Sequence, residues 1–277
     1  MIRSTRLALA VFATIVASPG VALAEEPPPR PWKDSADFGL VLTTGNTENL
    51  NVSLTNKFIY TWSNAEFTLD AAALRTENTT RELANDTAGN TVVVTETDTT
   101  TAEMYAVGGK YTRKIREAFF WYVNAGWVSN KPTGIDNRYG AGGGLGYRFF
   151  KTEVQTLAVE FGVDYTKEEQ TTGFSDSFAG ARVFLGYLYN ISKTSSFTED
   201  LTVLENLSDT DDLRARSVSA LTASLSQKLA LKVSLTLMYD NQPVVVDVQP
   251  VAPATQVAQF EFDRLDTILT AALVVNF

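Results

Sequence analysis

The sequence predicts an all-β protein, a transmembrane antiparallel β-barrel of about 12 strands connected as an up-and-down meander. Three observations predict this class. Long segments alternate apolar and polar residues with a period of two, as in a strand with one apolar face. No segment beyond residue 24 approaches the roughly 18 consecutive apolar residues of a membrane-spanning helix. The chain has no cysteine, and a sheet closed by its own hydrogen bonds needs no disulfide.

The first 24 residues have the features of a secretory signal peptide, and we exclude them from the predicted fold. Arg3 and Arg6 give a positive start, the run 7–17 is largely apolar, and residues 22–24 supply the small-x-small pattern of a cleavage site. The apolar run is too short for a spanning helix, and a retained membrane anchor is the alternative interpretation.

A proline-rich segment follows at 25–35, and its composition predicts an extended periplasmic tail. The barrel is therefore expected to occupy residues 36–277. Its strands show the alternation to different degrees, and we take the clearest first.

The segment 48–62 is the clearest strand. From Leu50 every second residue is apolar or aromatic except Asn56, and the residues between them are polar except Ile59. The strand ends in Tyr60 and Trp62, which are residue types found at a membrane–water boundary. Together with residues at the ends of other strands, they predict an aromatic girdle. Its expected members are Tyr60, Trp62, Tyr147, Tyr165 and Tyr239.

The segment 264–277 also alternates, and it ends in Leu273, Val275 and Phe277 on the apolar face. An alternating strand closed by phenylalanine resembles the signal by which barrel-insertion machinery recognises outer-membrane proteins. We expect these three residues to form that signal.

Further segments fit the same template less completely. In 65–74 the alternation dissolves into three alanines, and in 196–205 the apolar face carries Glu199. A β-bulge in either strand would re-aim the side chains, and a barrel of about ten strands is the competing count. The predicted strands are 36–43, 48–62, 65–74, 102–112, 118–128, 138–149, 156–166, 177–189, 196–205, 213–226, 231–240 and 264–277.

An even number of strands with both ends in the periplasm sorts the connections into two groups. Short periplasmic turns are expected at 63–64, 113–117, 150–155, 190–195 and 227–230. The long polar connections 75–101 and 241–263 then become external loops.

Three stretches carry a family resemblance: the glycine-bounded start of the first strands at 39–47, the glycine-rich 143–149, and the segment 206–241 with its acidic turn. Together they resemble the YdiY-like family of uncharacterised bacterial outer-membrane proteins, which is labelled salt-induced. The resemblance runs from about residue 36 to the end and implies an outer-membrane barrel. It carries over no catalytic residues.

The polar face of the strands is expected to line the lumen with acids and bases in near balance. A selective pore tends to carry one sign of charge at its constriction, so balance favours ion pairs across a narrow lumen. The predicted charge network comprises Lys57, Asp70, Arg148, Glu160, Asp164, Arg182, Asp200, Arg214, Arg216, Lys232, Asp240 and Asp266, with Asp37, Glu66 and Lys110 on the same face.

The favoured function is accordingly a structural barrel or a low-conductance pore of the Gram-negative envelope. One alternative is a channel for small hydrophilic solutes in which Arg182, Arg214 and Arg216 attract anions. Another is an outer-membrane enzyme that uses carboxylates alone, with Asp200 among the candidates. The chain has no histidine, so Ser-His and Asp-His chemistry is excluded, and we expect no enzyme.

Two motifs receive structural interpretations. The glycines of 140–146 lack the spacing of a phosphate-binding loop and lie on one face of a strand, so they are expected to make room for curvature or for a neighbouring ring. Asp209, Asp211 and Asp212 lack EF-hand spacing and predict a solvated acidic turn. We expect no metal and no cofactor.

The formal net charge of −9 has the wrong sign for a nucleic-acid-binding protein. The expected partners are outer-membrane lipid, lipopolysaccharide and the insertion machinery, and the expected state is a monomer in the cell outer membrane. A soluble periplasmic β-sandwich is the rival fold.

Overall fold

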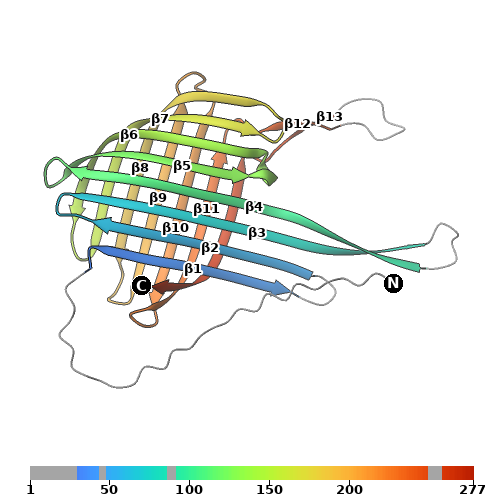
Figure 1. The fold of residues 1–277 in the computed structure, drawn as a ribbon, viewed down its shortest axis with the longest axis horizontal. Coiled ribbons are helices and arrows are strands. Elements are labelled where there is room, and N and C mark those ends of the chain that lie inside the picture. Colours follow the sequence, from blue (N-terminus) through green and yellow to red (C-terminus); the bar gives the residue numbers. More distant parts are fainter. Residues whose placement is uncertain (1–29, 44–47, 86–91, 249–257) are drawn as a thin grey trace. The chain divides into compact units, whose positions relative to one another are not determined.

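The structure is a computed structural model that describes residues 30–43, 48–85, 92–248 and 258–277. Within these ranges, twelve antiparallel strands form one closed barrel (Figure 1). Each strand pairs with its neighbours along the chain, and the last strand closes onto the first. The predicted fold class is confirmed, and so is the count of twelve. The predicted signal peptide at 1–24 lies outside the described residues.

The strands alternate in direction around the barrel. Their bounds are β1 (Trp32–Thr43), β2 (Glu48–Thr61), β3 (Ala65–Asn85), β4 (Val92–Lys114), β5 (Phe119–Asn130), β6 (Ile135–Lys151), β7 (Gln155–Gln170), β8 (Ser175–Asn190), β9 (Ser195–Asn206), β10 (Leu213–Ser224), β11 (Leu229–Asp240) and β14 (Leu265–Asn276). A separate two-stranded sheet of β12 (Val245–Val248) and β13 (Ala258–Glu261) lies between β11 and β14, and a short 3-10 helix, η1 (Lys131–Thr133), follows β5. No helix in the described ranges is long and apolar enough to cross a membrane.

The connections separate into two groups, as predicted. The short turns 62–64, 115–118, 152–154, 191–194 and 225–228 share one end of the barrel, which we call the turn end. The remaining connections share the loop end. They include 131–134, 171–174 and 207–212, together with the described parts of the connection after β11, residues 241–248 and 258–264, which we call the strap.

The prediction of a loop at 75–101 is wrong for most of its length. β3 continues to Asn85 and β4 begins at Val92, and the two pair throughout, with one register shift between Thr76 and Glu77. The many threonines and valines of this segment suit a pleated ribbon, and their strand propensity outweighs the polar composition that suggested a loop. Figure 1 shows this two-stranded extension leaving the barrel at the loop end.

Two smaller differences concern the ends of predicted elements. β1 starts at Trp32, so residues 32–35 belong to the barrel rather than to the predicted tail at 25–35. The predicted loop at 241–263 remains a connection, although it contains the paired strands β12 and β13.

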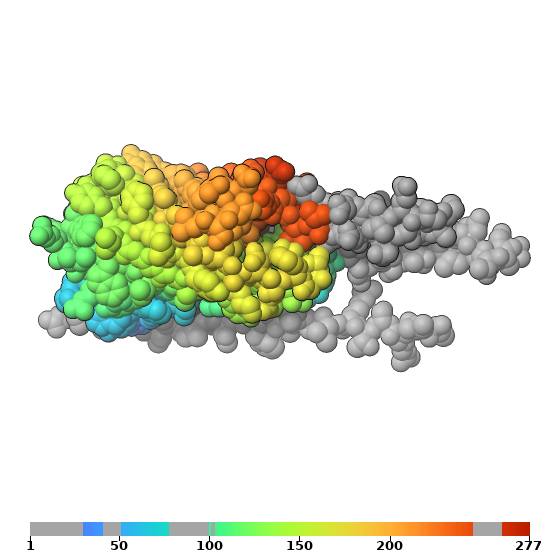
Figure 2. Space-filling view, turned by 90° about the horizontal axis from the view of Figure 1, so that it is seen from above, coloured from blue at the N-terminus to red at the C-terminus, as the bar shows by residue number. Residues whose placement is uncertain are grey.

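The pairing register fixes which face each residue occupies. Lys57 lies opposite Asp70 on the inner face, and Leu54 lies opposite Ala73 on the outer face. Outward apolar side chains are extensively exposed, and Leu269 reaches 73%. The inward side chains of Phe120 and Tyr122 on β5 are buried, and Tyr122 is only 1% exposed. Figure 2 shows the strands on one side of the barrel as a continuous wall.

The two predicted strands that fitted the pattern poorly, 65–74 and 196–205, contain no β-bulge. β9 pairs with β8 and β10 without a register shift, so Glu199 does lie on the outer face beside Leu201 and Phe197. Its carboxylate accepts hydrogen bonds from two outward hydroxyls of β10, those of Ser217 (2.6 Å) and Ser219. Local hydroxyl donors thus stabilise a carboxylate that faces away from the lumen.

The inward glycines of β6 make room for side chains of neighbouring strands, as predicted. A Cβ on Gly146 would collide with the ring of Phe120, and one on Gly142 would collide with the Asp164 carboxylate. Gly162 on β7 leaves space for the hydroxyl of Tyr122 in the same way. The glycines therefore allow rings and carboxylates to lie flat against the inner wall.

Candidate functional site: ion-pair clusters in the barrel lumen

The first concentration of charge in the lumen surrounds Glu160 on β7, which is 3% exposed. Its carboxylate forms an ion pair with Lys110 of β4 and a second with Arg182 of β8, the latter at 3.3 Å. Arg182 also lies 3.6 Å from Asp164 and donates a hydrogen bond of 3.0 Å to the Tyr122 hydroxyl. We call these five residues the Glu160 cluster.

Aromatic rings hold the two cations of the Glu160 cluster in place. The Lys110 ammonium lies 5.0 Å from the ring centroid of Tyr122 and 4.9 Å from that of Phe184. The Arg182 guanidinium lies over the same two rings at 5.4 and 5.3 Å. The two cations stack on aromatic rings and share the Glu160 carboxylate, so the cluster is packed and its charges are compensated on the inner face of β4–β8.

The second concentration surrounds Glu168, nearer the loop end of β7 and 5% exposed. Its carboxylate lies 2.6 Å from Arg138 of β6 and 2.7 Å from Arg214 of β10. Arg214 also lies 2.8 Å from Asp212 and 3.5 Å from Asp240. We call Arg138, Glu168, Asp212, Arg214 and Asp240 the Glu168 cluster.

One contact of the Glu168 cluster bridges the lumen. Arg138 on β6 lies 3.7 Å from Asp240 on β11. Four strands separate β6 from β11 along one side of the barrel and six along the other. Side chains from nearly opposite walls therefore meet, which narrows the passage at this level.

The strap lies over the same region. Its Val244 is buried, and a Cβ on Gly134, in the connection after β5, would lie 2.8 Å from the Val244 Cβ. Gly134 has φ +83°, so glycine is required there for both its backbone conformation and its close contact with the strap. The strap thus reaches from β11 to the β5–β6 connection.

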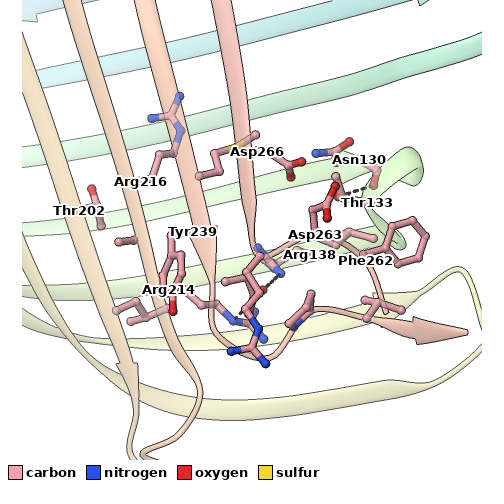
Figure 3. Close-up of a pocket in the computed structure, with 18 residues that line it drawn as sticks. Asn130, Thr133, Arg138, Thr202, Arg214, Arg216, Tyr239, Phe262, Asp263 and Asp266 are labelled. Carbon is pink, nitrogen blue, oxygen red and sulfur yellow. Dashed lines mark hydrogen bonds and ion pairs between the residues drawn. The ribbon is translucent and has the colours of Figure 1, made fainter. Parts of the chain in front are cut away.

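A cavity of about 170 Å³ lies beneath the strap, and Arg138, Arg214, Arg216, Asp240 and Asp266 contribute to its lining (Figure 3). In Figure 3 the Arg216 side chain points away from Arg138 and Arg214. Among the described residues, no carboxylate forms an ion pair with Arg216 within 4 Å. The charges of Asp200 and Asp70 act on it from farther away.

The other members of the predicted network fall into pairs and single residues. Lys232 lies 2.6 Å from Asp37, and Lys57 lies 3.7 Å from Asp70. Arg148 packs 5.4 Å from the centroid of the Phe120 ring. Asp200, the candidate of the carboxylate hypothesis, makes no contact with Asp266 within the described residues.

The predicted girdle residues lie on the outer face at both ends. At the turn end, Tyr60 and Trp62 have ring centroids 4.5 Å apart, and the row continues through Tyr111 and Trp121. Tyr147 packs against Phe149 at 5.1 Å. Tyr165 and Tyr239 are exposed near the loop end. Leu273, Val275 and Phe277 occupy the outer face of β14 and its end, and their role as an insertion signal stays a prediction.

Family comparison matches residues 36–249 to the family described as "Protein of unknown function, DUF481". The chain belongs to DUF481. A curated relative supports the predicted resemblance: the "Uncharacterized protein YdiY" of Escherichia coli (strain K12) is 22% identical over 214 residues. This alignment covers 77% of this chain and 76% of that protein.

Solved structures similar to this DUF481 chain include three that align with most of its length. The first is the NanC porin, with 12% identity over 88% of this chain and 98% of that chain, and a TM-score of 0.45. The anion-selective porin from Comamonas acidovorans has 9% identity over 89% and 98%, and a TM-score of 0.40. The translocator domain of autotransporter NalP from Neisseria meningitidis has 10% identity over 91% and 90%, and a TM-score of 0.42.

Three members of the Glu168 cluster in this DUF481 protein escaped the sequence prediction. Arg138 stood at the first position of its predicted strand, and Glu168 stood two residues beyond the predicted end of β7. Continuing the alternation from Glu160 and Asp164 would have placed Glu168 on the inner face. The prediction of a solvated acidic turn is wrong for Asp212, because its side chain is buried and contacts Arg214 and Asn206.

Proposed function

We propose that this chain is an outer-membrane β-barrel protein of the Gram-negative envelope, with a lumen narrowed by ion pairs to a low-conductance pore. The observation that carries the proposal is the division of the wall: apolar side chains cover the outer face and ionised side chains pair with one another on the inner face. Leu269, Phe161 and Val163 are each more than 60% exposed on the outer face. A wall of this kind suits hydrocarbon outside and water or polar groups inside.

The Glu168 cluster supports the low conductance. It brings Arg138 and Asp240 together from distant strands, and its two arginines are each compensated by carboxylates. A compensated constriction offers a permeating ion neither a strong binding site nor a single sign of charge. The proposed role is non-enzymatic, because Glu160 and Glu168 are each bound between two cations.

Single-channel recording in planar bilayers tests the proposal. We expect small, steady current steps with weak ion selectivity. Glu168→Gln leaves Arg138 and Arg214 without their shared carboxylate, so current should rise and shift toward anions. The matched control is Glu169→Gln, since Glu169 is the next residue, faces outward and pairs with Lys167. Equal currents in the two variants, or silence of the parent protein at all voltages, would refute the pore.

A second candidate, a channel for small anions, is favoured by one observation. Of the three arginines expected to attract anions, Arg182 and Arg214 are paired with carboxylates, whereas Arg216 points into the cavity without an ion-pair partner among the described residues. Arg216→Gln should then reduce anion preference, measured as the reversal potential in a salt gradient. An unchanged potential would remove this candidate.

The proposed setting includes lipopolysaccharide and phospholipid around the wall, the barrel-insertion machinery during assembly, and a monomeric final state. Cell fractionation, followed by electrophoresis with and without boiling, tests this setting. A closed barrel in the outer-membrane fraction should migrate faster unheated. Recovery of folded protein from the periplasm without detergent would contradict it.

A further inference from the structure

The weakest join in the barrel wall lies between β1 and β14. These strands pair at four positions, from Ser35↔Asn276 to Phe38↔Leu273. Every other neighbouring pair of barrel strands is joined at eleven positions or more in the described ranges. The ladder between β1 and β14 therefore stops partway up the wall.

From this point toward the loop end, β1 and β14 continue without pairing each other. β1 runs on through Gly39–Thr43 and pairs only with β2 there. The facing part of β14, residues 268–272, pairs only with β11. In an antiparallel strand every second residue directs its N–H and C=O toward the same neighbour. Half of the backbone groups on each of these edges consequently face the other strand without a partner from it.

A cavity of about 330 Å³ lies at this unpaired stretch, which we call the seam opening. Its lining comes from both faces of the wall. Gly39, Ser53 and Thr270 belong to the inner face, and Leu40 and Leu269 to the outer face. Residues of both faces contribute to the lining, which places the seam opening at the facing edges of β1 and β14.

The lining of the seam opening contains both polar and apolar groups. Hydroxyl and amide groups come from Asn51, Ser53, Thr76 and Thr270 on the inner face and from Thr267 on the outer face. Leu40, Leu269 and Ala271 supply apolar surface on the outer face, and Leu74 and Ile268 supply it on the inner face. Unpaired backbone groups at membrane depth are tolerated where they line a water-filled space or meet another polar group. A ligand for this site must therefore offer polar atoms to the strand edges and an apolar chain to the outer face.

We propose that the seam opening is a lateral passage between lumen and bilayer for a single-chain amphiphile of the fatty-acid class. The polar head hydrogen-bonds to the free edges of β1 and β14 and to the hydroxyls beside them. The apolar chain lies along Leu40 and Leu269 and extends into the lipid. The passage is independent of ion conduction through the lumen.

The four paired positions below the opening keep the barrel closed around it. Lys232 of β11 reaches past β14 to Asp37 of β1 at 2.6 Å, so an ion pair spans the seam at the level of the ladder. At the lower edge of the opening, a Cβ on Gly39 would lie 2.9 Å from the carbonyl oxygen of Ala271. Glycine at this position lets the strands lie close where the ladder ends.

Hydrogen exchange of the unmodified protein in lipid nanodiscs tests the opening directly. Within 268–272 the amides directed toward β1 should exchange rapidly, while the alternating amides directed toward β11 should be protected. The paired residues 273–276 provide the internal control. Protection of every amide in 268–272 would overturn the proposal.

A reversible lock tests the passage. The chain contains no cysteine, so an introduced pair is the only one present. Continuing the register of Phe38↔Leu273 by two residues places Leu40 opposite Ala271, and we choose Leu40→Cys/Ala271→Cys. The control is Val233→Cys/Ala271→Cys, which puts the same bridge on the fully paired side of β14.

The probe is a dansyl-labelled medium-chain fatty acid added to the protein in nanodiscs. Oxidation of the seam pair should weaken its binding about tenfold, and reduction should restore it, while the control pair has no effect. Equal binding to the oxidised and reduced seam variants would overturn the passage. Single-channel currents recorded from the same variants report on the pore separately, so failure of one proposal is distinguishable from failure of the other.

Discussion

Removal of the Glu168 carboxylate should destabilise the barrel more than any nearby surface change. Glu168 is 5% exposed and lies 2.6 Å from Arg138 and 2.7 Å from Arg214. Glu168→Gln keeps the size of the side chain but leaves two partly buried guanidinium groups with less compensating charge. Loss of one partner of a buried ion pair typically costs about 3–5 kcal/mol. This corresponds to roughly two to three and a half orders of magnitude in the unfolding equilibrium.

The neighbouring residue supplies the comparison. Glu169 faces outward, and its partner Lys167, at 2.9 Å, is more than half exposed. Exposed pairs contribute about 0–1 kcal/mol, so Glu169→Gln should have little effect. The two substitutions are chemically identical and adjacent in the sequence. The difference between their changes in unfolding free energy therefore isolates the effect of burial and of the second cation.

The measurement is the free energy of unfolding in phospholipid vesicles, followed by tryptophan fluorescence over a guanidinium gradient. A second arm combines Glu168→Gln with Arg138→Met, which removes one of the two uncompensated cations. This double variant should recover part of the loss because the two sites are coupled. If Glu168→Gln cost no more than Glu169→Gln, the Glu168 cluster would not be the stabilising unit described above.

Two further predictions concern the inner wall and the seam. Gly146→Ala should lower the free energy of unfolding by about 1–3 kcal/mol, because the new Cβ collides with the Phe120 ring. Gly140→Ala is the control, since a Cβ there has nothing within 4 Å. If folded protein converted to the heat-denatured band at the same midpoint temperature in both variants, the steric reasoning would be refuted. Lys232→Ala removes the ion pair that spans β1 and β14, so the band of folded protein should convert at a lower temperature than in Lys57→Ala, whose partner Asp70 lies farther away at 3.7 Å. Identical conversion temperatures for these two lysine variants would count against a role for Lys232 in closure.

The alternation of side chains predicted the barrel well because the outer face of each strand carries apolar side chains and the inner face carries charged ones. It placed Lys57, Asp70, Glu160 and Arg182 on the inner face, where the register has them. It could not pair them, because Arg138 and Asp240 meet across the lumen and sequence spacing carries no information about that distance. The prediction of a loop at 75–101 failed for a related reason: a two-stranded ribbon that extends past the barrel wall has no apolar face whose alternation would reveal it.

The ion pairs are distributed unevenly around the barrel, and this bears on where it can open. The Glu160 and Glu168 clusters tie together β4, β6, β7, β8, β10 and β11. Across the β1–β14 join, Lys232–Asp37 is the ion pair found among the described residues. Separation of the wall at that join would leave both clusters intact, whereas separation anywhere from β6 through β7–β10 to β11 would break the Glu168 cluster. The lumen constriction and the seam opening can therefore act independently, because different contacts hold them.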